Sequence, residues 1–296
     1  MSEILENKFR QWAKPPSQAE EDRCNNAASA IRNAISASSK LKNRNIKVFL
    51  QGSYRNNTNV RQDSDVDVGI LCSDTFFPDY PDGKGHSDFG IDPATYDYGD
   101  FKNDVGEALV AHFKDGTVTR GNKAFDIKAT SYHVEADVAP FFEHRRYSAD
   151  GRYTSGVQLL PDNGIPANII NWPEQHYENG VGKNKATSLR YKSLVRILKK
   201  LRNEMAEQGN NTAKPAVGFL LECLVWNVPN RLMGNNLYTE DMRQVLTHLY
   251  NSTKSNEGCS EWGEVSELKY LFNTAQKWTR SDAHNFVLAA WRHIGF

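Results

Sequence analysis

The alternation of apolar and polar residues predicts two strands early in the chain, separated by a short connection. Residues 46–50 form an apolar run that ends at Gly52 and Ser53, and after eleven further residues a second run spans 65–70. In the second run, aliphatic residues alternate with polar or small ones, which is the pattern of a half-buried strand. The predicted order is strand, Gly-Ser turn, short helical connection and strand.

Two carboxylates share one face of the second predicted strand. Successive side chains of a strand point to opposite faces, so Asp65 and Asp67 lie together while the aliphatic residues enter a core. Two carboxylates this close repel each other unless a cation lies between them. Mg²⁺ prefers such hard oxygen ligands and completes its shell with water and phosphate oxygens. The pair predicts a magnesium site for phosphate chemistry, and the alternative is a solvated strand edge.

Gly52 and Ser53 suit a phosphate site upstream of these acids. A residue without Cβ lets the backbone approach a phosphate closely, and a hydroxyl with neighbouring N–H groups binds phosphate oxygens. A Gly-Ser pair taken alone is more often a plain turn. Its position between a strand and the Asp-x-Asp run is what favours a nucleotide site.

Three further strand-like runs, 117–120, 125–130 and 134–141, predict an antiparallel extension of the sheet. In the third run, Glu135 and Asp137 share the face opposite the aliphatic residues. If this strand neighbours the first acidic strand, Asp137 lies beside the first two carboxylates, with Glu135 as the reserve candidate. The alternative is a half-exposed strand that carries two solvated acids.

Helical periodicity dominates the rest of the chain. A Ser-x-x-Glu capping box at residues 17–20 starts a first helix, and residues 101–112 form another. Residues 74–98 have the composition of a long surface loop, and residues 162–182 that of an ordered hinge. The spacing of apolar residues predicts further helices at 191–205, 217–228, 239–250, 265–278 and 282–293.

The helix expected at 191–205 lies in an unmixed positive region. Between residues 179 and 203 there is no acid. The cations in this region are Lys183, Lys185, Arg190, Lys192, Arg196, Lys199, Lys200 and Arg202. A solvated helix face is the alternative, but such a face normally mixes both signs. The run therefore predicts a polyanion site, and a nucleoside triphosphate is an anion of suitable size.

Composition indicates a folded protein that does not bind long nucleic acid. The 296 residues, 39% hydrophobic and 11% aromatic, suffice for one large domain or two. Lys plus Arg and Asp plus Glu are 36 each, whereas proteins that grip nucleic acid are usually basic. The four cysteines are far apart and form no metal-binding motif. The longest apolar segment, 217–228, contains Glu222, so we expect a cytoplasmic protein without a leader or membrane span.

These motifs resemble the polymerase-β-like nucleotidyltransferase superfamily, and more narrowly the bacterial cGAS/DncV-like nucleotidyltransferases of the CdnE clade. Four runs carry the resemblance: QGSYRNNTNVRQDSDVDVGI, ADV at 136–138, NWPEQHYENG at 171–180 and FLLECLVWNVP at 219–229. The C-terminal residues beyond them match less clearly. The resemblance implies an α+β fold, with a catalytic palm in residues 1–165 and a mainly α-helical lobe in residues 166–296 that closes the active-site cleft.

The resemblance also implies the roles of the acidic and Gly-Ser residues. Gly52 and Ser53 would hold the donor triphosphate. The catalytic carboxylates would be Asp65, Asp67 and Asp137, because the superfamily requires a third acid on a later strand. These three would bind two Mg²⁺ ions, for which Mn²⁺ can substitute.

The same resemblance assigns further substrate contacts. Lys199, with Ser188 or Lys192, would steady the β- and γ-phosphates. Asn171 aligns with the asparagine that contacts the base in pyrimidine-using CdnE relatives. Its amide can pair with uracil or with adenine, so hydrogen bonding alone leaves the base open. The alternative is an asparagine that caps the turn before Pro173.

Enzymes of this family make cyclic di- or trinucleotide signals in antiphage defence (CBASS) systems. The resemblance implies a Mg²⁺-dependent enzyme that joins UTP with ATP, or UTP alone, into cyclic UMP-AMP or cyclic di-UMP. The product would act on a separate effector, and the enzyme would be a monomer. The zinc-binding thumb of the animal sensor is absent, which argues against activation by double-stranded DNA.

Two other functions remain open from the sequence. One is template-independent synthesis of linear oligonucleotides, and the other is a catalytically silent nucleotide-binding or partner-binding module. The presence of all three candidate carboxylates argues against the silent module. Resistance of the product to phosphatase separates cyclic from linear synthesis.

Overall fold

The computed structural model describes residues 2–60, 66–114, 116–130 and 134–296. It divides into two compact units, each built from segments that are distant in the sequence. The helical unit comprises Met1–Pro16, Arg55–Arg61 and Glu174–Phe296. The sheet unit comprises Ser17–Tyr54 and Gln62–Pro173.

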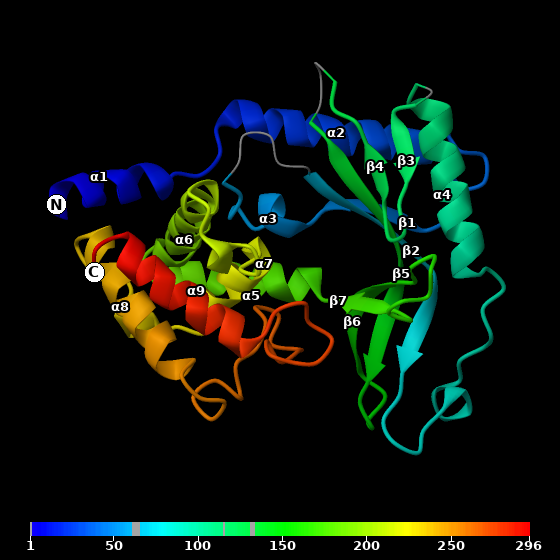
Figure 1. Ribbon diagram of the computed structural model, residues 1–296. Helices are drawn as coiled ribbons and strands as arrows, with labels where there is room; N and C mark the ends of the chain where they lie inside the picture. The colour runs from blue at the N-terminus through cyan, green and yellow to red at the C-terminus, as the bar shows by residue number, and fades with distance from the viewer. Residues whose placement is uncertain (1, 61–65, 115, 131–133) are drawn as a thin grey trace. The chain divides into compact units, whose positions relative to one another are not determined.

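The sheet unit is built on a mixed sheet, which has seven strands in the described residues (Figure 1). The strands are β1 (Ile46–Leu50), β2 (Val66–Asp79), β3 (Val118–Arg120), β4 (Phe125–Ile127), β5 (Ala136–Tyr147), β6 (Tyr153–Leu159) and β7 (Ile169–Asn171). Their order is β1-β2-β5-β4-β3, and β6 pairs with both β5 and β7. Strands β2 and β5 are parallel, and the other pairs are antiparallel.

Helices α2 (Gln18–Ala37) and α4 (Tyr98–His112) pack together over one face of this sheet (Figure 1). The predicted capping box starts α2, because the Ser17 hydroxyl accepts from the Glu20 N–H and the Glu20 carboxylate accepts from the Ser17 N–H. The alternating residues Val66, Val68 and Ile70 are fully buried beneath the helices. The opposite face of β2 therefore carries the polar residues. The remaining short elements are α3 (Gly52–Arg55) and the 3₁₀ turn η1 (His86–Phe89).

The helical unit packs around α6, whose large apolar residues are fully buried. Its helices are α1 (Ser2–Trp12), α5 (Pro173–Ala186), α6 (Arg190–Glu207), α7 (Gly218–Trp226), α8 (Tyr238–Ser252) and α9 (Arg280–His293), with 3₁₀ turns η2 (Asn211–Ala213) and η3 (Asn230–Leu232). Within the described residues, no helix combines the length and apolarity needed to cross a membrane.

Three predictions of secondary structure were wrong in part. Strand β2 continues to Asp79, because it still pairs with β5 after a bulge. The first residues of the loop predicted at 74–98 therefore belong to this strand. The expected hinge at 162–182 contains most of α5. Residues 265–278 form turns and an isolated bridge instead of a helix, and their apolar spacing reflects side chains that enter the core from a loop.

The compact units differ from a simple division at residues 165 and 166. Strand β7 pairs with β6, so the chain as far as Pro173 belongs to the sheet unit. Helix α1 belongs to the helical unit because Phe9 is buried in its core. Residues 55–61 also belong to the helical unit, although they lie between two strands of the sheet in sequence.

Candidate active site

Parallel pairing of β2 with β5 brings two predicted carboxylates together. Asp67 is the register partner of Asp137, and partners in a sheet share one face. The flanking residues on both strands are buried in the core, so the two acids lie on the opposite face. Asp65, the third predicted acid, lies outside the described residues.

Gly52 lies directly against the Asp67 carboxylate. Its φ is +64°, a conformation that side chains disfavour, and a Cβ added there would lie 2.0 Å from Asp67 Oδ2. The contact follows from the pairing of β1 with β2, which continues in a bond from the Gln51 N–H to the Asp67 carbonyl of 2.9 Å. Ser53 follows at once and is partly exposed. The structure therefore places the Gly-Ser turn beside the acid pair, and their shared role in a nucleotide site stays a prediction.

The donor set of this site fits a magnesium ion. Mg²⁺ takes one or two carboxylates from a protein and fills its other positions with water and phosphate oxygens. Asp67 and Asp137 supply those carboxylates, and Gly52 can lie against Asp67 because it has no side chain. Within the described ranges, which exclude Asp65, no three Asp, Glu, His or Cys side chains group into a metal site. An ion here would need substrate or water oxygens.

The register adds an acid that the sequence pattern missed. Asp126 on β4 is the antiparallel partner of Asp137, so it shares the face of the acid pair, and it is exposed. Strand β4 has only three residues, too few for alternation to reveal which face its acid occupies. The reserve candidate, Glu135, lies just before β5, and its carbonyl accepts from the Val66 N–H at 2.9 Å.

Asn171 lies on the same sheet but far along it from the acids. It ends β7, is exposed, and pairs with Val157 of β6, which in turn pairs with Glu143 of β5. The step along β5 from Asp137 to Glu143 corresponds to about 20 Å at the usual rise of a strand. Asn171 therefore lies well away from the acids, and its contact with a base stays a prediction.

The helical unit holds the other predicted contacts. Ser188 and Leu189 form the link between α5 and α6, are exposed, and have φ angles of 51° and 65°. Non-glycine residues in this region are strained, and such strain gathers at ligand sites. Lys192 is half-buried, which lowers the pKa of its ammonium, and its Nζ lies 5.6 Å from the centre of the Tyr177 ring.

Lys199 is placed differently from Lys192. Its side chain is buried, and Nζ lies 3.1 Å from Thr58 Oγ1 and 3.1 Å from Glu222 Oε2. The phosphate contact predicted for Lys199 stays a prediction, and its ammonium already has two protein partners. The sequence feature that could have indicated the pairing of Lys199 with Glu222 is the presence of this acid within an otherwise apolar helix.

The positive region around α6 is not one solvated face. Arg196 is buried, and Arg190 Nε lies 3.4 Å from the buried Asp241. Lys183 donates to the Val228 carbonyl, and burial lowers its pKa to about 8. Several of these cations thus bind groups of the helical unit itself, which leaves Lys192 as a better candidate for an anionic substrate.

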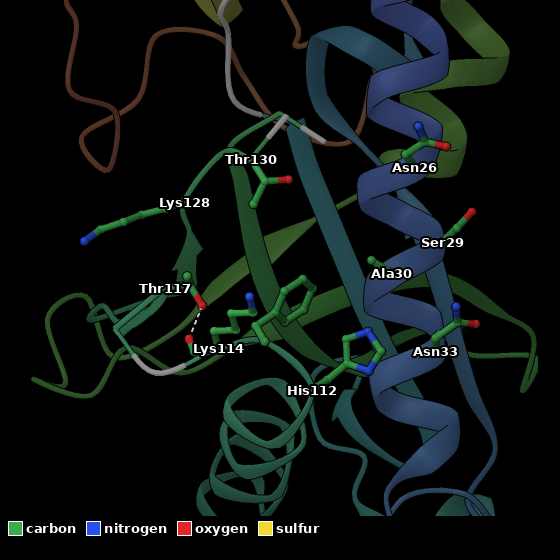
Figure 2. Close-up of a pocket in the computed structure, with 10 residues that line it drawn as sticks. Asn26, Ser29, Ala30, Asn33, His112, Lys114, Thr117, Lys128 and Thr130 are labelled. Atoms are coloured by element: carbon green, nitrogen blue, oxygen red, sulfur yellow. Dashed lines mark hydrogen bonds between the residues drawn. The ribbon is translucent and has the colours of Figure 1, made fainter. Parts of the chain in front are cut away.

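A cavity of about 470 Å³ lies elsewhere in the sheet unit, beside α2 and the end of α4 (Figure 2). Its lining residues are Asn26, Ser29, Ala30, Asn33, His112, Phe113, Lys114, Thr117, Lys128 and Thr130. None of the predicted site residues is among them. Figure 2 shows Lys128 pointing away from the other labelled side chains, so the cavity does not gather its cations around one ligand.

Comparison with known proteins agrees with this arrangement. The nucleotidyltransferase domain family matches residues 31–149, and the family described as cGAS/DncV-like nucleotidyltransferase C-terminal helical domain matches residues 178–295. The chain is 44% identical to the cyclic dipyrimidine nucleotide synthase CdnE of Cecembia lonarensis, over 100% of both chains. The chain belongs to the cGAS/DncV-like nucleotidyltransferases. It is a nucleotidyltransferase with the predicted α+β fold of a polymerase-β-like palm and a helical lobe.

Two other proteins are similar along nearly their whole length. A cyclic dipyrimidine nucleotide synthase CdnE from Legionella pneumophila is 43% identical to the nucleotidyltransferase over 99% of both chains. A CdnE cyclic dinucleotide synthase from Elizabethkingia meningoseptica, solved with GTP and Apcpp, is 35% identical. Its structure superposes with a TM-score of 0.82 and covers 98% of this chain and 99% of its own.

Proposed function

We propose that this nucleotidyltransferase makes a pyrimidine-containing cyclic dinucleotide, either cyclic UMP-AMP from UTP and ATP or cyclic di-UMP from UTP alone. The observation that carries the proposal is the 44% identity, over the full length, to a protein named as a cyclic dipyrimidine nucleotide synthase. Such a product acts as a second messenger in CBASS antiphage defence. The enzyme works in the cytoplasm as a monomer, and its product acts on a separate effector.

The acid pair supports a metal-assisted reaction. Asp67 and Asp137, with Asp65, would hold two Mg²⁺ ions, for which Mn²⁺ can substitute. When bound, Mg²⁺ lowers the pKa of a nucleotide 3′-hydroxyl and neutralises charge on the leaving pyrophosphate. Asp67 and Asp137 are both partly exposed on the face that they share, where a cation would relieve their repulsion.

The residues of the chain position the reacting groups. Gly52 lets the donor triphosphate approach the acid pair, and the Ser53 hydroxyl donates to a phosphate oxygen. The 3′-oxygen of one nucleotide forms a bond to the α-phosphorus of the other. The bond between that α-phosphorus and the oxygen that links it to the β-phosphorus breaks. Asp137 accepts the hydroxyl proton, and pyrophosphate leaves. A second such step, after the linear dinucleotide rebinds in the reverse orientation, closes the ring and releases a second pyrophosphate.

Other predicted residues bind the rest of the substrate. Lys192, with Ser188, contacts the β- and γ-phosphates, and Lys199 is the alternative predicted from sequence. Lys192 is favoured because this residue is only half-buried, whereas Lys199 is buried. Asn171 reads the base, and its exposed side chain at the end of β7 is free of the sheet core.

The experiment is incubation of the full chain with the four labelled ribonucleoside triphosphates and Mg²⁺, followed by alkaline phosphatase and mass spectrometry. The expected product is phosphatase-resistant and has the mass of cyclic UMP-AMP or cyclic di-UMP. Its loss in Asp67→Asn would tie the product to the proposed site. A phosphatase-sensitive ladder would instead favour linear synthesis, and a lack of any product would favour a silent nucleotide-binding module.

A further inference from the structure

Four polar side chains form a closed network inside the helical unit. Glu222 of α7 accepts hydrogen bonds at one oxygen, from Thr58 at 2.8 Å and Lys199 at 3.1 Å. Its other oxygen lies 2.9 Å from His176 Nε2 of α5. Lys199 also lies 3.1 Å from the Thr58 hydroxyl. Thr58 is 0% exposed, and Glu222 and Lys199 are 4% exposed, so water does not share these bonds.

The charge on Glu222 persists because of its neighbours. Burial alone would raise the pKa of this carboxyl, but Lys199 and His176 hold the pKa well below its ordinary value. A buried ion pair contributes little to stability compared with apolar residues of the same shape, yet removing one partner is costly. The network therefore makes a better device for fixing position than for adding stability.

The fixed position is that of the segment 55–60. Besides the bonds to Thr58, the Asn57 carbonyl accepts from Arg196 Nη1 at 2.5 Å, and Arg55 forms an ion pair with Glu174 of α5. Arg196 is buried and also donates to the Ala13 carbonyl at 2.8 Å. Each of the helices α5, α6 and α7 therefore supplies a side chain that contacts the segment. These side chains are Glu174, Lys199 and Glu222.

This segment joins the two halves of the proposed site along the chain. Ser53, before it, belongs to the sheet unit, and so does Asp67, after it, whereas residues 55–61 belong to the helical unit. We infer that Lys199 and Glu222 are positioning residues, which hold Thr58 and thereby fix the segment 55–60 that continues from α3, so that the Gly-Ser turn at the start of α3 keeps its place for catalysis. This inference rests on the proposed active site, and it gives Lys199 a role other than phosphate contact.

Thr58→Val tests the inference with little change of shape. It removes the hydroxyl that both Lys199 and Glu222 contact, and we expect kcat to fall about tenfold or more, since small misplacements of reacting groups slow catalysis strongly. Thr58→Ser keeps the hydroxyl and should restore most of the activity. The matched control is Thr253→Val, because Thr253 is also fully buried in the helical unit and hydrogen-bonded, to the Leu249 carbonyl at 2.7 Å.

Calorimetric titration with a non-hydrolysable triphosphate and Mg²⁺ separates positioning from phosphate contact. For a positioning role, Lys199→Met and Thr58→Val keep the dissociation constant within about threefold while kcat falls. Combining Thr58→Val with Glu222→Gln should cost little more activity than either change alone. If Lys199→Met does not fold, the Thr58 variants carry the test, with the melting temperature as the check of folding.

Three results would overturn the inference. One is wild-type kcat in folded Thr58→Val, another is equal loss of kcat in Thr253→Val, and the third is a dissociation constant raised tenfold or more in Lys199→Met with kcat unchanged. Failure of the proposed site itself has a different signature, which is retained turnover in Asp67→Asn.

Discussion

Asp67 and Asp137 are register partners on the parallel strands β2 and β5, so their carboxylates share the face of the sheet that lies opposite the core. A parallel pair requires a long connection between its strands, and here that connection contains α4, β3 and β4. The two acids are thus brought together by the topology of the sheet, although they are distant in the sequence.

The first prediction concerns these acids. Asp67→Asn should lower kcat by about 100-fold or more, because a metal ligand contributes several kcal/mol to transition-state stabilisation. The melting temperature should hardly change, since Asp67 does not enter the core. Asp137→Asn should behave alike, whereas Glu135→Gln should retain turnover. Activity lost in Glu135→Gln but kept in Asp137→Asn would move the third carboxylate to the reserve candidate.

The second prediction uses two glycines with similar backbones. Gly52→Ala and Gly90→Ala each add a side chain at positive φ, +64° and +62°, which costs about 1–2 kcal/mol of stability. The new Cβ at Gly52 would collide with the Asp67 carboxylate, while nothing lies within 4 Å at Gly90. Gly52→Ala should therefore lose activity and need more Mg²⁺ for half-maximal rate, and Gly90→Ala should be active. Equal Mg²⁺ requirements in the two variants would contradict the proposed contact.

The third prediction concerns the phosphates of the donor. Lys192→Ala should raise the KM for triphosphate about tenfold, because it removes a charge-assisted contact of about 1.5–3 kcal/mol, with a smaller change in kcat. Lys200→Ala is the matched control, since Lys200 is a partly exposed lysine on the same helix. Steady-state kinetics with varied triphosphate checks both. An unaltered KM in Lys192→Ala would leave the phosphates to other residues.

The fourth prediction is a pH dependence of stability. The folded pKa of Glu222 lies below its ordinary value of 4.5, so its contribution is complete above pH 4.5 and is lost as the pH falls through the folded pKa. Glu222→Gln should reduce the free energy of unfolding by about 3–5 kcal/mol at neutral pH. Below pH 4.5 this difference should narrow by up to about 1.4 kcal/mol per pH unit.

Urea unfolding of wild type and Glu222→Gln at several pH values measures this difference. Glu207→Gln is the control, because Glu207 is exposed in the same unit and should show almost no difference at any pH. If the difference in free energy of unfolding between wild type and Glu222→Gln stays constant from neutral to acid pH, the carboxyl is not held in its charged form.

Local patterns in the sequence predicted the parts of the molecule that local physics determines. The buried Val66, Val68 and Ile70 follow from alternation, and the start of α2 follows from its capping box. The α+β class and the family followed from the resemblance carried by the Gly-Ser and Asp-x-Asp stretch and three later runs, and they are confirmed by the comparisons.

Long-range contacts were beyond the reach of such patterns. Periodicity placed Lys199 on a basic helix, but only the fold shows that it meets Thr58 and Glu222, which are distant from it in sequence. The pairing of Asp126 with Asp137 was hidden for the same reason, since a three-residue strand has no measurable period. The three-residue strand β7 is likewise recognised only by its pairing with β6.

The last prediction concerns the choice of base. Asn171 offers one acceptor and two donors, which can pair with N3–H and O4 of uracil. A site built to pair with one base edge rejects another base by leaving polar groups unsatisfied. Asn171→Ser shortens the side chain and removes the amide, so selection should relax or shift toward purines, whereas total turnover should fall much less than in Asp67→Asn. The exposed position of Asn171 at the end of β7 means that the change should not disturb the core.

Competition among four labelled triphosphates, with wild type and Asn171→Ser side by side, measures this selection. Asn163→Ser serves as the control, because Asn163 is another exposed asparagine of the sheet unit, and it should keep the wild-type base profile. The wild type should incorporate uridine into its cyclic product, and the fraction of purine in the product should rise in Asn171→Ser. Purine-only products from the wild type, or the same base profile in both enzymes, would refute the role of Asn171, because a side chain that pairs with the base cannot be removed without changing which base is preferred.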